Sequence, residues 1–180
     1  MTSRKFFILF ILCAAVPLIA AKISLSFGIF NQGGTNKGEW LQHDIQLLPE
    51  IADIITSGEL NTSVHWHLVY VQSATCEQQC EQALFTLQQL YAGMGRKQLK
   101  VKTLMMAKQQ PAQLKKFPAI GWQPELSVAN ELQNQIVIVN QRGLVLLRYP
   151  IADSPEHMRD LARDIRTDLL RLINYDRSGA

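Results

Sequence analysis

Residues 64–91, VHWHLVYVQSATCEQQCEQALFTLQQLY, decide the fold, because a strand pattern runs directly into a helix pattern. Residues 64–71 are dense in β-branched and aromatic side chains, which predicts a buried strand. From Cys76 onward, three leucines and Tyr91 recur at helical spacing until Gly93, which predicts a helix with one apolar stripe. The two cysteines of this segment are therefore expected at a strand-to-helix turn.

The rest of the chain continues this alternation of strands and helices. Downstream, the patterns predict a strand over 99–106 and then a polar connection over 107–134, which contains several prolines and has room for a short helix. Two strands follow, over 136–139 and 144–148, joined by the turn NQRG. A final helix is expected to begin at Ser154 and Pro155. The resulting order, β-α-β followed by β-β-α, is the core succession of the thioredoxin fold. We therefore predict an α/β, thioredoxin-like domain with helices on both faces of one sheet.

The N-terminus carries an export signal. Arg4 and Lys5 precede an uncharged apolar run over 6–21, and a second apolar stretch follows Lys22 as far as Phe30. A helix over 6–30 would extend about 37 Å, enough for a hydrocarbon core of about 30 Å. Cleavage after the first run would place an isoleucine at position −3, which fits a signal peptidase poorly. The sequence thus favours an uncleaved transmembrane signal-anchor over a cleaved signal peptide.

Charge around this segment predicts its orientation. Two basic residues precede the span and one, Lys22, follows it, which favours a cytoplasmic N-terminus and an exported domain. The chain is thus expected to cross the inner (cytoplasmic) membrane once, with its C-terminal domain on the periplasmic side.

The length of the chain predicts its division into domains. With 180 residues and 47% hydrophobic content, the chain has enough apolar side chains to build one hydrophobic core rather than two. We expect an anchor over 1–30, a tether and N-terminal extension over 31–60 with a short helix over 49–57, and the thioredoxin-like domain over 61–180.

Global charge does not favour nucleic acid as a partner. The net charge of +3 comes from the N-terminal segment, because residues 31–180 carry 15 basic and 15 acidic side chains. No acidic residue lies between Glu81 and Glu125, however, and this stretch predicts a basic face. The face is either solvated or a docking surface for an acidic partner or anionic lipid. Its basic residues are Arg96, Lys97, Lys100, Lys102, Lys108, Lys115 and Lys116.

Cys76 and Cys80 form the most reactive motif of the chain. Cys13 lies within the apolar N-terminal run, so these two are alone in the exported part, where an oxidising compartment permits a disulfide. A helix N-terminus lowers a thiol pKa, and the thiolate is the form that exchanges disulfides and binds Cu(I). Glu77 opposes this effect slightly. The residues alone leave three roles open: a redox pair, a Cu(I) site, or a merely structural or vestigial pair.

The run HLVYVQSATCEQQCEQAL, residues 67–84, is similar to the Sco/SenC family of copper chaperones for cytochrome c oxidase assembly. That family combines an N-terminal anchor, a thioredoxin-like domain, a CxxxC motif after a strand and a copper-binding histidine far downstream. Cys76 and Cys80 match the family's cysteines, but the histidine's position falls near Leu132, within NELQNQ, where there is none. Glu77 and Glu81 also stand where the family has prolines. The chain resembles a divergent relative of the family.

The resemblance implies a role in cytochrome c oxidase biogenesis. Cys76 and Cys80 would deliver Cu(I) to the oxidase copper site, or act as a thiol–disulfide oxidoreductase that reduces a disulfide there. The partner would be a cytochrome c oxidase subunit or another assembly factor. The alternative is a non-catalytic, membrane-tethered scaffold that docks its partner through the basic face.

Other side chains that suit copper have structural explanations that fit their positions better. Histidines on the buried strand are expected in the core, the remaining histidines at the surface, and methionines of the second strand in the core. These residues are His65 and His67, His43 and His157, and Met105 and Met106.

Overall fold

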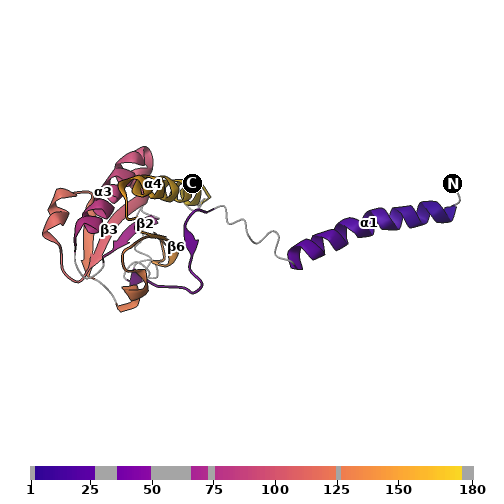
Figure 1. Ribbon diagram of the computed structural model, residues 1–180, viewed down its shortest axis with the longest axis horizontal. Helices are drawn as coiled ribbons and strands as arrows, with labels where there is room; N and C mark the ends of the chain where they lie inside the picture. The colour runs from indigo at the N-terminus through magenta and orange to yellow at the C-terminus, as the bar shows by residue number, and fades with distance from the viewer. Residues whose placement is uncertain (1–2, 27–35, 50–65, 73–75, 125–126, 176–180) are drawn as a thin grey trace. The chain divides into compact units, whose positions relative to one another are not determined.

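The computed structural model describes residues 3–26, 36–49, 66–72, 76–124 and 127–175 (Figure 1). The chain divides into two units, Met1–Asn36 and Lys37–Ala180. The first contains the helix α1 (Ser3–Ser26), which exposes many large apolar side chains. No helix in the described ranges combines the length and the apolar character that crossing a membrane requires. The second unit contains the thioredoxin-like elements.

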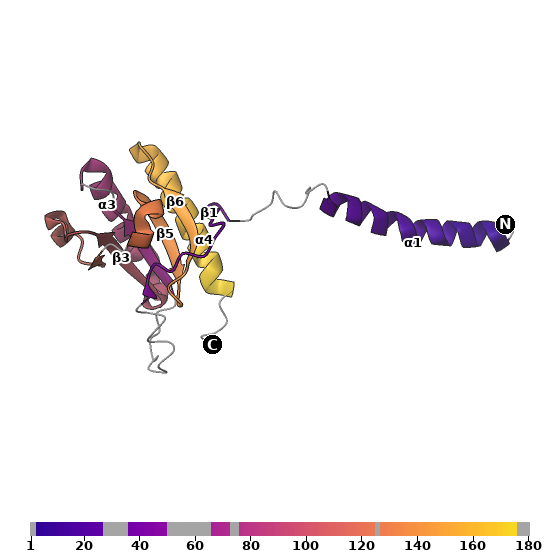
Figure 2. The ribbon, with the colours of Figure 1, turned by 90° about the horizontal axis from the view of Figure 1, so that it is seen from below.

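Six strands form the sheet of the second unit, in the order β1-β6-β5-β2-β3-β4. The strands β2, β3 and β4 are mutually parallel, whereas β5 runs antiparallel to β2, and β6 lies antiparallel between β5 and β1. Figure 2 shows β1 beside β6. The bounds are β1 Glu39–Trp40, β2 Trp66–Val71, β3 Val101–Ala107, β4 Ile120–Pro124, β5 Gln135–Asn140 and β6 Val145–Pro150.

Two layers of apolar side chains cover the sheet. The helices α3 (Gln78–Gly93) and α4 (Pro155–Tyr175) pack on one face of the sheet (Figure 1). Trp66, Leu68 and Tyr70 of β2 belong to the apolar cluster on this face. Alternate β2 residues face the second layer, which the segment 41–48 and Leu132 help to build. The two α-helices described for the domain, α3 and α4, share the first face, whereas the short helix η3 (Ser127–Leu132) contributes Leu132 to the other layer. The helix predicted over 49–57 falls almost wholly outside the described residues.

Several elements confirm the pattern-based predictions. The turn between β5 and β6 places Gly143 at φ 78°, where a Cβ would lie 2.1 Å from the Leu48 carbonyl oxygen, so glycine is required. The α4 helix begins at Pro155, and the Ser154 hydroxyl accepts a hydrogen bond from the His157 N–H at 3.3 Å. The strand β3 begins two residues later than predicted.

One strand differs from the predictions, and one N-terminal segment adds to the domain. The strand β4 lies within the stretch predicted as an irregular connection, because prolines at positions 118 and 124 conceal a short edge strand in which Ile120 is the buried residue. Residues 37–48, part of the stretch predicted as a tether and N-terminal extension, lie in the same compact unit as the thioredoxin-like elements. They contribute β1 and three buried side chains, Ile45, Leu47 and Leu48.

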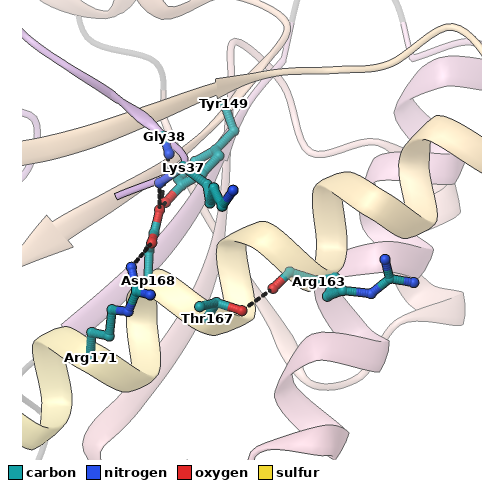
Figure 3. Close-up of polar contacts among 7 residues, drawn as sticks. All are labelled: Lys37, Gly38, Tyr149, Arg163, Thr167, Asp168 and Arg171. Carbon is teal, nitrogen blue, oxygen red and sulfur yellow. Dashed lines mark hydrogen bonds and ion pairs between the residues drawn. The ribbon is translucent and has the colours of Figure 1, made fainter. Parts of the chain in front are cut away.

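A buried carboxylate joins this N-terminal segment to α4 (Figure 3). Asp168 is fully buried, and its Oδ2 accepts hydrogen bonds from the Lys37 N–H at 2.7 Å, the Gly38 N–H at 2.9 Å and the Tyr149 hydroxyl at 2.8 Å. Its Oδ1 lies 3.7 Å from a guanidinium nitrogen of Arg171. Burial and the Asp168 carboxylate raise the pKa of Tyr149, so its hydroxyl stays a donor. We call this group the carboxylate clasp.

Candidate functional site

The two cysteines form a disulfide at the turn that leads into α3. Their Cα atoms are 5.0 Å apart, whereas four residues of α-helix rise about 6 Å, so Cys76 cannot continue the helix. The helix accordingly begins at Gln78, with Glu77 at its N-cap position. This confirms the predicted position of the cysteines at a strand-to-helix turn.

The two sulfurs differ in exposure. Cys80 lies in the first turn of α3, is 2% exposed and belongs to the same apolar cluster as Leu84 and Met105. Cys76 is half-buried and packs against the edge of that cluster. A partner molecule can therefore reach Cys76 more readily than Cys80.

Charges around the turn are partly balanced. The N-terminus of α3 supplies positive potential near both sulfurs. Glu81, the residue after Cys80, pairs with Lys116 at 2.8 Å, which offsets its unfavourable effect on a thiolate. Lys116 ends the short helix η2 (Ala112–Lys116), so this element contributes a cation to the site.

A chain of hydrogen bonds holds the residue before Cys80. The Gln79 amide donates through Nε2 to Asp153 Oδ1 at 3.2 Å and accepts through Oε1 from Asn134 Nδ2 at 3.3 Å. Asn134 Oδ1 in turn accepts from the Tyr70 hydroxyl at 3.4 Å. Burial raises the pKa of Tyr70 to about 12, which keeps this hydroxyl protonated. We call these four residues the amide relay.

A protein-family model described as transmembrane-like, thioredoxin-like, C-terminal domain matches residues 66–173, from the start of β2 to the end region of α4. The chain belongs to this family. The match confirms the thioredoxin-like fold predicted from the sequence. No curated protein matches the chain.

Solved structures of Sco proteins are similar to this thioredoxin-like family member. Apo Sco1 from Thermus thermophilus is 15% identical over 78% of this chain and 99% of its own, with a TM-score of 0.49. A SCO1/SenC family lipoprotein from Bacillus anthracis is 13% identical over 70% and 95%, with a TM-score of 0.40. Copper-bound ScoI from Bradyrhizobium japonicum is 17% identical over 54% and 83%, also with 0.40. At these sequence identities, the likeness shows a similar fold and nothing further.

Residues 132–134, near the position at which the resemblance would have placed a histidine, have two structural roles. Leu132 is fully buried in the second apolar layer and offers no ligand. Asn134, two residues later, contacts the CxxxC turn through the amide relay. Among the described residues, no cluster of three or more His, Cys, Asp or Glu side chains is arranged to hold a metal ion.

Three histidines, His43, His67 and His157, lie in the described residues. His67 is buried opposite Lys102 near the start of β2, whereas the cysteines follow the other end of that strand, so it is the predicted core histidine. Burial, and secondarily Lys102, lower the pKa of His67 to about 4. His43 contacts Glu131 at the surface, and His157 contacts Ser154, as predicted for surface residues. His65 falls outside the described residues.

The methionines of β3 are core residues. Met105 and Met106 are 0% and 1% exposed, as predicted for this strand. Their thioethers face opposite layers of the sheet, because Met105 belongs to the helix-covered cluster and Met106 to the other one. Packing therefore accounts for both side chains.

The residues of the predicted basic face fall into two groups, one at each end of β3, whose seven residues extend about 20 Å. At the amino end of β3, Lys97 bonds to Asn174 near the end of α4. At its carboxyl end, Lys116 pairs with Glu81 at the start of α3. The first group comprises Arg96, Lys97, Lys100 and Lys102, and the second Lys108, Lys115 and Lys116.

A groove of about 630 Å³ between α3 and α4 begins at the CxxxC turn. Gln78, from within the motif, lies at its rim, and Phe85, Phe117 and Met158 form its apolar wall. Phe85 is 56% exposed, which is unusual for a large aromatic side chain. In the sequence, Phe85 falls beside the leucine stripe of the predicted helix rather than on it. A large aromatic side chain off the apolar stripe was the signal that could have indicated this groove.

Proposed function

We propose that this protein assists cytochrome c oxidase biogenesis by thiol–disulfide exchange through Cys76 and Cys80. The Cys76–Cys80 disulfide carries this proposal, because a pair that closes in one state gives up two electrons and two protons in forming that bond. The resemblance of residues 67–84 to the Sco/SenC family supports a disulfide at the copper site of the oxidase as the substrate.

The exchange starts from the reduced pair. The Cys76 thiolate attacks one sulfur of the partner's disulfide, which forms a mixed disulfide and releases the partner's other sulfur as a thiolate. The Cys80 thiolate then attacks the Cys76 sulfur, closes the Cys76–Cys80 bond and releases the partner's second thiolate. The partner gains two electrons, and its two thiolates take up two protons, which balance the two that the Cys76 and Cys80 thiols lost in becoming thiolates. The greater exposure of Cys76 supports its role in the first attack.

Delivery of Cu(I) as cargo is the second version of this function. Reduced Cys76 and Cys80 would offer two soft sulfur ligands. The position of the Sco family's histidine falls near Leu132, which is not a ligand, and His67 lies at the far end of β2. Copper delivery, which would need a third ligand, therefore has less support than thiol–disulfide exchange. Titrating the reduced protein with Cu(I) against a competing chelator separates the versions. Binding that survives both Cys76→Ser and Cys80→Ser would contradict copper delivery.

Anchoring by the N-terminal segment, residues 1–30, would place this chemistry at the periplasmic surface of the inner membrane. The apolar run over 6–21 and the exposed apolar side chains of α1 support the anchor, and Arg4 and Lys5 support a cytoplasmic N-terminus. An oxidase subunit or another assembly factor would then meet the pair on the same side. Alkaline extraction of membranes should leave the protein in the pellet, and external protease should digest the domain in spheroplasts. Release by alkali would contradict the anchor.

Complementation of a deletion strain tests the proposed function directly. Cys76→Ser, Cys80→Ser and the double variant should lose oxidase activity in isolated membranes, whereas the matched control Cys13→Ser should retain it. Full activity of the double variant would contradict thiol exchange and favour the scaffold. Because the basic residues form two groups, charge reversal of each group separately would then locate the docking surface.

A further inference from the structure

The amide relay ties the CxxxC turn to the segments that precede β5 and α4. Gln79 lies inside the ring that the disulfide closes, and both polar atoms of its side chain are engaged, one by Asp153 and one by Asn134. The side chain is thus held from two directions, by the segment before α4 and by the segment before β5. Movement of the turn would disturb both contacts.

Asn134 is a fixed point of this network. Its backbone N–H donates to the Val71 carbonyl at 2.8 Å, and its carbonyl accepts from the Ile151 N–H at 3.2 Å, so it joins the ends of β2 and β6. Its φ of 56° lies in the left-handed region, which asparagine tolerates better than most residues. Its side chain is held in addition by the fully buried Tyr70. The Nδ2 donor that faces Gln79 is therefore preorganised.

We propose that the amide relay is a positioning device that favours the disulfide-bonded state of Cys76 and Cys80 and so makes the pair a stronger reductant. The disulfide holds the two Cα atoms at 5.0 Å, closer than four residues of helix rise, and the relay supports Gln79 in that geometry. When the bond opens, the turn is free to relax, and the relay contacts weaken. Contacts that are stronger in one state shift the equilibrium toward that state. This inference rests on the proposed thiol exchange.

Redox titration of the full-length chain in detergent tests the proposal. The protein is equilibrated with glutathione buffers of increasing reducing strength, and the dithiol fraction is measured by alkylation and mass spectrometry. Gln79→Ala removes the centre of the relay, and Asn134→Gly removes the amide while it accommodates the positive φ. Each should shift the equilibrium constant roughly three- to tenfold toward the dithiol, where tenfold corresponds to about 30 mV.

Two controls separate positioning from general structural support. Gln89→Ala, an exposed glutamine later on α3, should leave the equilibrium unchanged. The Gln79→Ala and Asn134→Gly double variant should shift it little more than either single change, because both belong to one relay. Thermal unfolding of both forms should show that the variants destabilise the oxidised protein more than the reduced one.

The outcomes distinguish this inference from the proposed function. A wild-type pair that does not exchange with glutathione overturns both. If the wild-type pair exchanges but the relay variants titrate like wild type, or if Gln89→Ala shifts the equilibrium equally, the relay proposal fails while thiol exchange stands. Equal destabilisation of both forms, with an unchanged equilibrium constant, would make the relay a structural feature without redox effect.

Discussion

Replacing Asp168 with asparagine is expected to lower the free energy of unfolding of the domain by about 2–3 kcal/mol. One carboxylate oxygen accepts three hydrogen bonds, two from the N–H groups of Lys37 and Gly38 and one from Tyr149. A hydrogen bond to a charged group contributes roughly 1 kcal/mol more than a neutral one, so the three bonds together lose about 3 kcal/mol. Burying an amide costs less than burying a carboxylate, and this difference offsets a part of the loss. Asparagine keeps the shape of the side chain, so the change isolates the charge.

Urea unfolding of the full chain in detergent, followed by circular dichroism, measures this effect. Asp160→Asn is the matched control, because Asp160 lies on the same helix in an exposed pair with Arg163 and should cost less than about 0.5 kcal/mol. The melting temperature of Asp168→Asn should fall by about 5–10 °C. A loss as small as that of the control would refute the clasp as a main contributor to stability.

Three further predictions follow from the site and the core. Gly38→Ala should destabilise the domain by about 1–3 kcal/mol, since its Cβ would lie 2.4 Å from the Tyr149 ring; an unchanged urea midpoint would contradict this clash. Burial lowers the pKa of His67 to about 4 in the folded protein. On acidification, the unfolded chain therefore takes up a proton on this side chain at a higher pH than the folded chain does. Stability should thus be full above about pH 6.5 and decline toward pH 4, and His67→Gln should flatten the profile. In the reduced protein, iodoacetamide should modify Cys76 before Cys80; the reverse order would exclude Cys76 as the attacking sulfur.

The sequence predicted elements where periodicity is strong and local. The dense apolar run of β2 and the leucine stripe of α3 depend on neighbouring residues, so one sequence was enough to place the cysteines between them. The short edge strand β4 was missed, because glycine and proline conceal five residues of pairing with β3.

Contacts between distant residues account for the features that sequence reasoning did not find. Gln79 and Asn134 are 55 positions apart, and no local pattern links them. Asp168 did leave a signal, since it lies three positions after Ile165 and beside Leu169 on the apolar stripe of α4. A charge at such a position is buried at a cost and requires partners. Its partners, the N–H groups of residues 37 and 38, could not be inferred.

Both edges of the sheet are poor templates for association. At one edge, β1 is two residues long, and at the other, β4 contains Gly121 and ends at Pro124, which has no N–H to donate. Long, regular edge strands invite other chains to add to them, whereas short or proline-containing edges resist such growth. The two edge strands that the structure describes thus offer little regular backbone with which a neighbouring copy could pair.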